Sequence, residues 1–236
     1  MPWNPLVPEA RRIVGVKTAG RPAPPTHVVC HITGTNSLTL VIHEFTTSVS
    51  PHYLVDKAGL IYQFVPEVDQ AWHAGIKSAV QERYAHPATD WQKYHFYFDW
   101  DHYPSGSVFL DRQLQRVQGG HVATYVAQSD GSIWDKYRYF RSRWGNGAGP
   151  LNYSVSHRPN EYSIGIEILS VGANTASAAA YTPAMYASLR TLVTDICTRN
   201  GIPMKKGTVL GHEDVNPMQR YGWDPNQGFD WSQVWS

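Results

Sequence analysis

The sequence predicts an α/β fold, formed by a single domain with a central mixed β-sheet flanked by helices. Two observations carry this prediction. Segments with strand composition alternate along the chain with segments of helical periodicity, and such interleaving favours a sheet covered by helices. The chain has 236 residues, which suits one large domain or two small ones and suffices to bury a core without disulfide bonds.

Three segments are expected to form the strands. Residues 26–32 are rich in β-branched side chains and are followed by Thr33-Gly34, which marks the end of a strand. Residues 52–64 are typical of a hairpin that turns near Gly59. The third strand is expected over residues 163–169.

The third strand alternates strictly between apolar and other residues. Ile164, Ile166 and Ile168 therefore share one face, which we assign to the core, and Gly165 and Glu167 share the other. On that second face, the missing side chain of Gly165 is expected to leave room for a ligand beside Glu167.

Two helices are predicted, over residues 37–46 and 183–199. The second has a complete set of end signals, with Thr182 as N-cap, Pro183 in the first turn and Asn200-Gly201 at the end. Its apolar residues recur with the helical period.

Two segments stand apart from this pattern. Residues 1–25 are rich in proline, and we expect an irregular strap over the surface. Residues 76–159 contain 16 of the chain's 30 aromatic residues and include Asp130-Gly131, a signal for a hairpin turn. We interpret this segment as an insertion whose aromatic rings pack on the main domain, with a sugar-stacking platform as the alternative.

Charge and composition exclude several classes of protein. Lys and Arg number 20 against 19 Asp and Glu, so the chain lacks the basic excess of a nucleic-acid binder. Aromatic residues make up 13% and charged residues 17%, which excludes a disordered chain and a coiled coil. No stretch approaches the roughly 18 apolar residues of a membrane span. We therefore expect no nucleic-acid partner and no membrane span. We also expect a monomer.

The N-terminus and the cysteines bear on cellular location. Prolines at positions 2, 5 and 8 and the pair Arg11-Arg12 interrupt the apolar run that a secretory signal needs. We expect synthesis in the cytoplasm, with release, injection or a removed signal as routes to the exterior. Cys30 and Cys197 are too few for a disulfide framework or a multi-cysteine metal site, and buried thiols are the simplest interpretation.

A metal site is one interpretation of three separated residues. His31 ends a predicted buried strand, His212 lies in a loop that follows an apolar run, and Asp224 follows 12 positions later. Two imidazoles and one carboxylate make a suitable zinc site with an open fourth position. The alternative is a set of unrelated loop residues, and Glu213 and Asp214 compete with Asp224 for the carboxylate role.

Glu167 is the candidate general base. If the isoleucine face of its strand is core, its carboxylate faces a cleft, where partial burial raises a carboxyl pKa toward the range that a base requires. The alternative is an ordinary solvated carboxylate on a strand.

Six short motifs in a fixed order resemble the zinc-dependent N-acetylmuramoyl-L-alanine amidases, which share a fold with peptidoglycan-recognition proteins. The matching residues cover roughly 26–75 and 160–235, outside the strap and the insertion. The motifs are Val28–Thr33, Val49–Gly59, Ala71–Gly75, Asn160–Glu167, Gly211–Asp214 and Asp224-Pro225 followed by Phe229–Trp231.

The resemblance implies a zinc site in a surface groove, with His31, His212 and Asp224 as ligands. It also implies that Glu167 is the catalytic glutamate. The substrate would be peptidoglycan or a muropeptide, cut at the amide bond between N-acetylmuramic acid and L-alanine. The residues expected to contact it are Tyr53, Trp72, His73 and Asn160.

One position departs from the family pattern. A lysine usually stands two residues before the aspartate ligand and stabilises the oxyanion, whereas this chain has Gly222 there. Arg220 is the candidate replacement for that positive charge.

Three other functions compete with the amidase. A recognition module of the same fold would bind peptidoglycan without cutting it. A glycosidase would use Glu167 as acid with Asp214 or Asp224 as partner. A zinc endopeptidase would need the helical H-E-x-x-H motif, which is absent from the sequence. A recycling enzyme, a phage lysin and an injected toxin all fit the amidase reading.

Overall fold

The fold is described from a computed structural model of the chain. The chain divides into two compact units, which are described separately: the first comprises Met1–Gly75, His157–His212 and Asp224–Ser236, and the second comprises Ile76–Ser156 and Glu213–Trp223. The described residues are 3–75, 108–110, 113–116, 125–127, 133–135, 159–171, 181–215, 220, 224–225 and 228–235.

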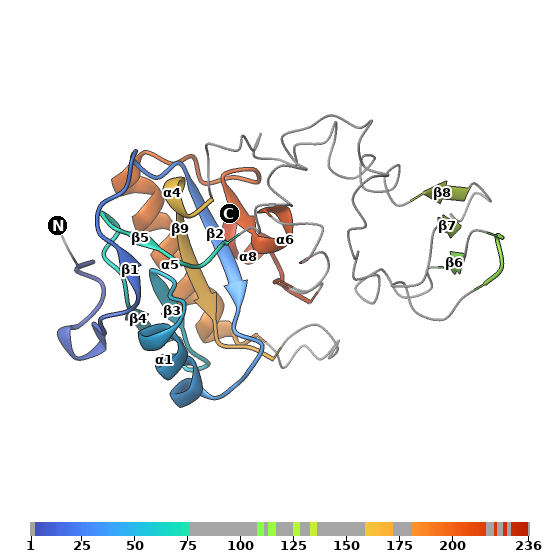
Figure 1. Ribbon diagram of the computed structural model, residues 1–236. Helices are drawn as coiled ribbons and strands as arrows, with labels where there is room; N and C mark the ends of the chain where they lie inside the picture. The colour runs from blue at the N-terminus through green and yellow to red at the C-terminus, as the bar shows by residue number, and fades with distance from the viewer. Residues whose placement is uncertain are drawn as a thin grey trace. The chain divides into compact units, whose positions relative to one another are not determined.

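A five-stranded mixed sheet forms the centre of the first unit (Figure 1). Its strand order is β10-β2-β9-β3-β4, in which the first four strands are parallel and β4 is antiparallel to β3. The strands are β2 (His27–Ile32), β3 (Tyr53–Val55), β4 (Ile61–Gln63), β9 (Ser163–Ile168) and β10 (Val209–Gly211). The predicted mixed sheet is confirmed, and so are the strands expected over residues 26–32, 52–64 and 163–169, whereas β10 was not among the expected strands.

Two helices cover this sheet, α1 (Leu38–Thr47) and α5 (Pro183–Asn200). The expected end signals of α5 are present: the Thr182 hydroxyl accepts a hydrogen bond from the Met185 N–H at 3.1 Å. Gly201 ends the helix with a φ of 65°, a left-handed conformation that glycine adopts without steric cost. In α1 the Ser37 hydroxyl accepts from the Leu40 N–H in the same way.

Strand register decides which side chains share a face. His31 pairs with Glu167, and Glu167 pairs with Leu54, so these three lie on one face of the sheet. Cys30, Ile166 and Tyr53 pair across the same strands and lie on the opposite face. The isoleucines of β9 are buried, as predicted.

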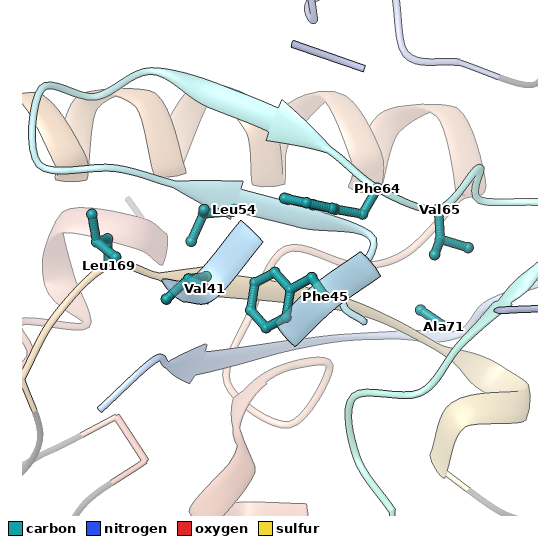
Figure 2. Close-up of a cluster of buried hydrophobic side chains, with 7 residues drawn as sticks. All are labelled: Val41, Phe45, Leu54, Phe64, Val65, Ala71 and Leu169. Atoms are coloured by element: carbon teal, nitrogen blue, oxygen red, sulfur yellow. The ribbon is translucent and has the colours of Figure 1, made fainter. Parts of the chain in front are cut away.

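The hydrophobic core on the Leu54 face joins α1 to the sheet (Figure 2). Phe45 and Phe64 meet edge to face, with ring centroids 5.2 Å apart. Burying such side chains contributes about 1.5–3 kcal/mol each. The buried members of the cluster are Val41, Phe45, Leu54, Phe64, Val65, Ala71 and Leu169.

The N-terminal segment runs along β4, the edge strand of the sheet. Ile13 N–H donates to the Gln63 carbonyl at 2.8 Å, and Asn4 N–H donates to the Gln63 side chain at 2.7 Å. Further along, β1 (Lys17–Thr18) pairs antiparallel with β5 (Gln70–Ala71). The remaining short helices of this unit's described residues are η1 (Glu9–Arg11), α4 (Pro159–Tyr162), α6 (His212–Val215, which continues into the second unit) and α8 (Ser232–Trp235).

The second unit contains a three-stranded antiparallel sheet among its described residues. Its strands are β6 (Val108–Leu110), β7 (Tyr125–Ala127) and β8 (Ile133–Asp135). Pairing of Ala127 with Ile133 agrees with the hairpin expected at Asp130-Gly131. The aromatic run over residues 91–103 lies outside the described residues. No helix in the described part of the chain is long and apolar enough to cross a bilayer.

Candidate metal centre

The side chains of His31, His212 and Asp224 meet at the C-terminal ends of the parallel strands β2 and β10. His31 is the penultimate residue of β2, and His212 follows β10 directly. Because β10 and β2 are parallel, with Gly211 opposite Cys30, the two histidines leave the sheet side by side. Asp224 joins them, and the ligand atoms of the three residues all lie within 4.8 Å of one another. The structure thus brings together the three residues that the sequence analysis assigned to zinc.

The geometry of this cluster fits a tetrahedral ion. Asp224 Oδ2 lies 2.8 Å from His212 Nδ1 and 3.7 Å from His31 Nδ1. Ligands about 2.0–2.1 Å from zinc at tetrahedral corners lie roughly 3.3 Å from one another, between these two values. All three residues are at most 3% exposed, so the site is shielded from bulk water. Two imidazoles and a carboxylate are also the donor types that zinc binds.

Neighbouring groups orient the Asp224 carboxylate and favour its ionised form. Its Oδ1 accepts a hydrogen bond from the backbone N–H of Ile32 at 2.8 Å, which leaves Oδ2 directed at the two imidazoles. Burial alone would raise the pKa of Asp224, but His212 and His31 outweigh it, and the pKa is lowered well below its usual range. The carboxylate is therefore ionised at neutral pH, as a metal ligand must be.

Glu167 lies next to the cluster on the neighbouring strand. It pairs with His31 in the register of β9 and β2, and it shares the same face of the sheet. Adjacent strands lie about 4.8 Å apart, so the two side chains leave the sheet as direct neighbours. Glu167 is half-buried, and the Oε2 atom of its carboxylate is itself buried.

The space above Gly165 is filled by His73, which corrects the expectation that it holds a ligand. A Cβ atom at Gly165 would lie 2.3 Å from Cγ and 2.4 Å from Nδ1 of His73. The glycine is therefore needed for the close approach of an imidazole to β9.

His73 contacts His31, one of the three proposed metal ligands, directly. Its Nδ1 lies 2.9 Å from His31 Nε2, and the two rings meet edge to face. Burial, reinforced by the neighbouring His31 and His52, lowers the pKa of His73 well below the ordinary histidine value. His73 is thus neutral at physiological pH.

Trp72 and Asn160 frame the same segment. Asn160 Oδ1 accepts a hydrogen bond from the Ala74 N–H at 2.8 Å and so ties residues 72–75 to α4. Trp72 is 45% exposed, and its indole N–H donates to the Thr18 hydroxyl at 3.0 Å. A substrate contact stays a prediction for both residues.

Tyr53 is placed away from this face, contrary to its expected substrate contact. It occupies the face of the sheet opposite to His31 and is fully buried. Its hydroxyl donates to Glu67 at 2.5 Å, and Glu67 in turn receives two hydrogen bonds from Arg199 at 2.7 Å. Tyr53 belongs to a polar network beneath the sheet, because the strand alternation turns it away from the ligand face.

The candidate cation Arg220 belongs to the second unit, as do Glu213 and Asp214. Its role in stabilising an oxyanion stays a prediction.

The sequence analysis gave His52 no role, yet in the structure its side chain is hydrogen-bonded to the backbone of β9 at Gly165. Its Nδ1 accepts a hydrogen bond from the Gly165 N–H at 3.0 Å, and its Nε2–H donates to the Asp69 carbonyl at 3.2 Å. Burial, together with the nearby Arg21 guanidinium, lowers the pKa of His52 to about 3. In the sequence, His52 is marked only by its position in the motif Val49–Gly59. That position does not show which atoms the imidazole contacts.

The chain is similar in sequence to known amidases, and the similarity includes the three clustered residues. A sequence profile of the family described as N-acetylmuramoyl-L-alanine amidase matches residues 21–94 and 77–227, which together are most of the chain. A relative from Haemophilus influenzae, "1,6-anhydro-N-acetylmuramyl-L-alanine amidase AmpD", is 33% identical over 89 residues. That match spans 38% of this chain and 44% of the relative, so it covers less than half of the relative's length.

Two solved amidase structures resemble the chain over most of its length. A selenomethionine derivative of AmpD has a TM-score of 0.49 at 20% identity, covering 98% of this chain and 94% of that one. The E. coli amidase AmiD, in complex with an anhydro-N-acetylmuramic acid peptide, has a TM-score of 0.46 at 22% identity, covering 90% and 58%. The family profile matches far more than half of the chain and spans all three clustered residues, and on this ground the chain belongs to the N-acetylmuramoyl-L-alanine amidase family.

Proposed function

We propose that this chain is a zinc-dependent amidase that hydrolyses the bond between N-acetylmuramic acid and L-alanine in peptidoglycan or muropeptides. The observation that carries the proposal is the buried cluster of His31, His212 and Asp224, with Glu167 beside it on the next strand. Family membership supports the choice of substrate. The names of the compared relatives favour 1,6-anhydro-muropeptides as the first substrates to test.

The three clustered residues would hold the ion. When bound, zinc supplies Lewis acidity, which polarises a carbonyl and makes water easier to deprotonate. The ligand set carries one negative charge, from Asp224, so the loaded site keeps a net positive charge. That charge favours the negative oxygen that develops during amide hydrolysis.

Glu167 would move the protons. Its carboxylate takes a proton from the attacking water and later delivers it to the departing amine of L-alanine. The place of Glu167 beside His31 on the neighbouring strand supports this role. Arg220 is the proposed cation for the oxyanion, and Trp72 and Asn160 are the proposed contacts for the glycopeptide.

The variant E167Q tests the role of Glu167. The amide side chain keeps the shape of the carboxylate but cannot accept the proton from water, so amide cleavage should fall by about 10²–10⁴-fold. The zinc content should stay close to that of the wild type, because Glu167 is not among the proposed ligands. Mass spectrometry of digested anhydromuropeptides measures the release of free peptide, and metal analysis measures the zinc. Cleavage near the wild-type rate would contradict the assigned role.

The recognition module remains the competing function. It predicts that muropeptides bind to the wild-type chain without release of peptide. The glycosidase predicts new reducing ends that survive treatment with a chelator. Because the two proposed products are chemically different, the same mass spectra distinguish an amidase from a glycosidase.

A further inference from the structure

A chain of hydrogen bonds leads from His31 away from the metal cluster. His31 Nε2 lies 2.9 Å from His73 Nδ1, and His73 Nε2 lies 3.2 Å from Ser163 Oγ. Ser163 Oγ in turn lies 2.5 Å from the carbonyl oxygen of Pro159. All four residues belong to the first unit.

The last member fixes the direction of every bond. A carbonyl oxygen only accepts, so the Ser163 hydroxyl donates its one proton to Pro159. Ser163 Oγ therefore accepts from His73, whose proton must sit on Nε2. A neutral imidazole has one N–H, so His73 Nδ1 is an acceptor. It accepts from His31, whose proton must then also lie on Nε2.

This direction leaves the Nδ1 lone pair of His31 facing the cluster, where Nδ1 lies 3.7 Å from Asp224 Oδ2. A histidine binds a metal ion through an unprotonated ring nitrogen, and a hydrogen bond at the other nitrogen sets which one that is. We propose that His73 is a positioning residue, which accepts the Nε2 proton of His31 and so keeps its Nδ1 ready to bind the ion. This inference rests on the proposed zinc site, because the tautomer of His31 matters only if His31 is a ligand.

The position of the His73 ring is itself built into the fold. Ser163 and Gly165 are two residues apart on β9, so both present the same face to the ring. Gly165 lets the ring approach, since a Cβ atom there would lie 2.3 Å from His73 Cγ. Asn160 holds the adjacent backbone through the Ala74 N–H. These contacts hold His73 in one orientation, which a residue that only touches substrate would not require.

The test uses the full chain, labelled with ¹⁵N in its histidines and freed of metal with a chelator. Long-range ¹H–¹⁵N correlation spectra report which ring nitrogen of His31 carries the proton. A second readout is the zinc affinity, measured in competition with a chromogenic chelator. The variants are H73L, which removes the acceptor, and H73N, whose amide oxygen can replace Nδ1. The control is H43L, because His43 is an exposed histidine on α1.

We expect His31 to carry its proton on Nε2 in the wild type, in H73N and in H43L. In H73L the proton should distribute over both nitrogens, and the zinc affinity should fall by about 10–100-fold. H73N should keep most of the affinity, and H43L should keep all of it. If H73L does not fold, as judged by circular dichroism, S163A takes its place, with a smaller change of tautomer in the same direction.

Two results would overturn the inference. One is a wild-type His31 protonated on Nδ1, and the other is an H73L variant with unchanged tautomer and unchanged zinc affinity. The proposed function fails differently: the wild type would show the expected tautomer of His31 but bind no zinc or release no peptide. Because the tautomer is read in metal-free protein, the two failures are distinguishable.

Discussion

Asp224 accepts a hydrogen bond from the backbone N–H of Ile32, which lies 192 residues earlier in the chain. This bond places the carboxylate at the end of β2, next to His31 from the same strand. One buried carboxylate thus accepts a hydrogen bond from the backbone at the end of β2 and lies against the two proposed histidine ligands. The structural role and the proposed metal-binding role can be separated by mutation.

The variants D224A and D224N separate them. D224A leaves the Ile32 N–H without its acceptor, which should lower the free energy of unfolding of the metal-free protein by about 1–3 kcal/mol. D224N keeps an oxygen for that bond and should lose less. Both variants should lose tight zinc binding, because neither supplies a charged ligand. Urea denaturation and metal analysis measure the two effects, and a D224N chain that retains one tightly bound zinc would contradict the ligand assignment.

Gly165 is predicted to act on the metal site through His73. The variant G165A places a methyl group where the His73 ring lies, so the ring must move and its contact with His31 must be lost. Zinc affinity should fall by about 10-fold or more, while the far-UV circular dichroism spectrum stays unchanged. G75A is the matched control, because nothing lies within 4 Å of a Cβ atom there. Equal zinc affinities in G165A and G75A would argue against this role.

His52 is predicted to make stability depend on pH. Its pKa is about 3 in the folded chain, chiefly because of burial, against about 6.5 in an unfolded chain. Protons therefore bind the unfolded state first as the pH falls below about 6.5, and stability decreases. This group alone should cost about 2 kcal/mol between pH 7 and pH 5. In metal-free protein, H52N should show a correspondingly smaller loss of unfolding free energy over this interval, and an identical loss would contradict the prediction.

Glu67 is predicted to make stability depend on pH over a more acidic range than His52 does. Burial would raise its pKa, but hydrogen bonds from Arg199, Tyr53 and Asn200 outweigh burial and lower the pKa. Its contribution to stability is therefore complete above the unfolded carboxyl pKa of about 4.3 and is lost as the pH falls below it.

The variant E67Q removes this charge. It should be less stable than the wild type by about 1–3 kcal/mol at pH 7, since it loses charge-assisted hydrogen bonds. The difference should shrink as the pH is lowered toward 3. Denaturation curves at both pH values measure it, and a difference that grows toward acid pH would disprove the sign.

The strands and helices of the first unit were predictable because their signals are local. The alternation of Ile164, Ile166 and Ile168 assigned the two faces of β9 correctly, and Thr182 and Gly201 marked the ends of α5. His31 and Glu167 came together because each could be assigned to a face of a strand that ends at the same edge.

The two predictions that were wrong depended on contacts between residues far apart in the chain. The sequence does not state the register between β3 and β9, and without it Tyr53 could not be assigned to the face opposite His31. The sequence correctly indicated free space beside Gly165, but the prediction that a ligand occupies it was wrong. His73, which lies 92 positions earlier in the chain, fills that space. Tertiary contacts of this kind leave no periodic signal in the chain.

The central claim is that the cluster of His31, His212 and Asp224 binds the zinc ion that amide hydrolysis requires. The most direct measurement is peptide release from an anhydromuropeptide by the wild-type chain after treatment with a chelator and after zinc is restored. We expect that release stops, returns with about one zinc per chain, and does not return in D224A. Full release by metal-free protein would contradict it.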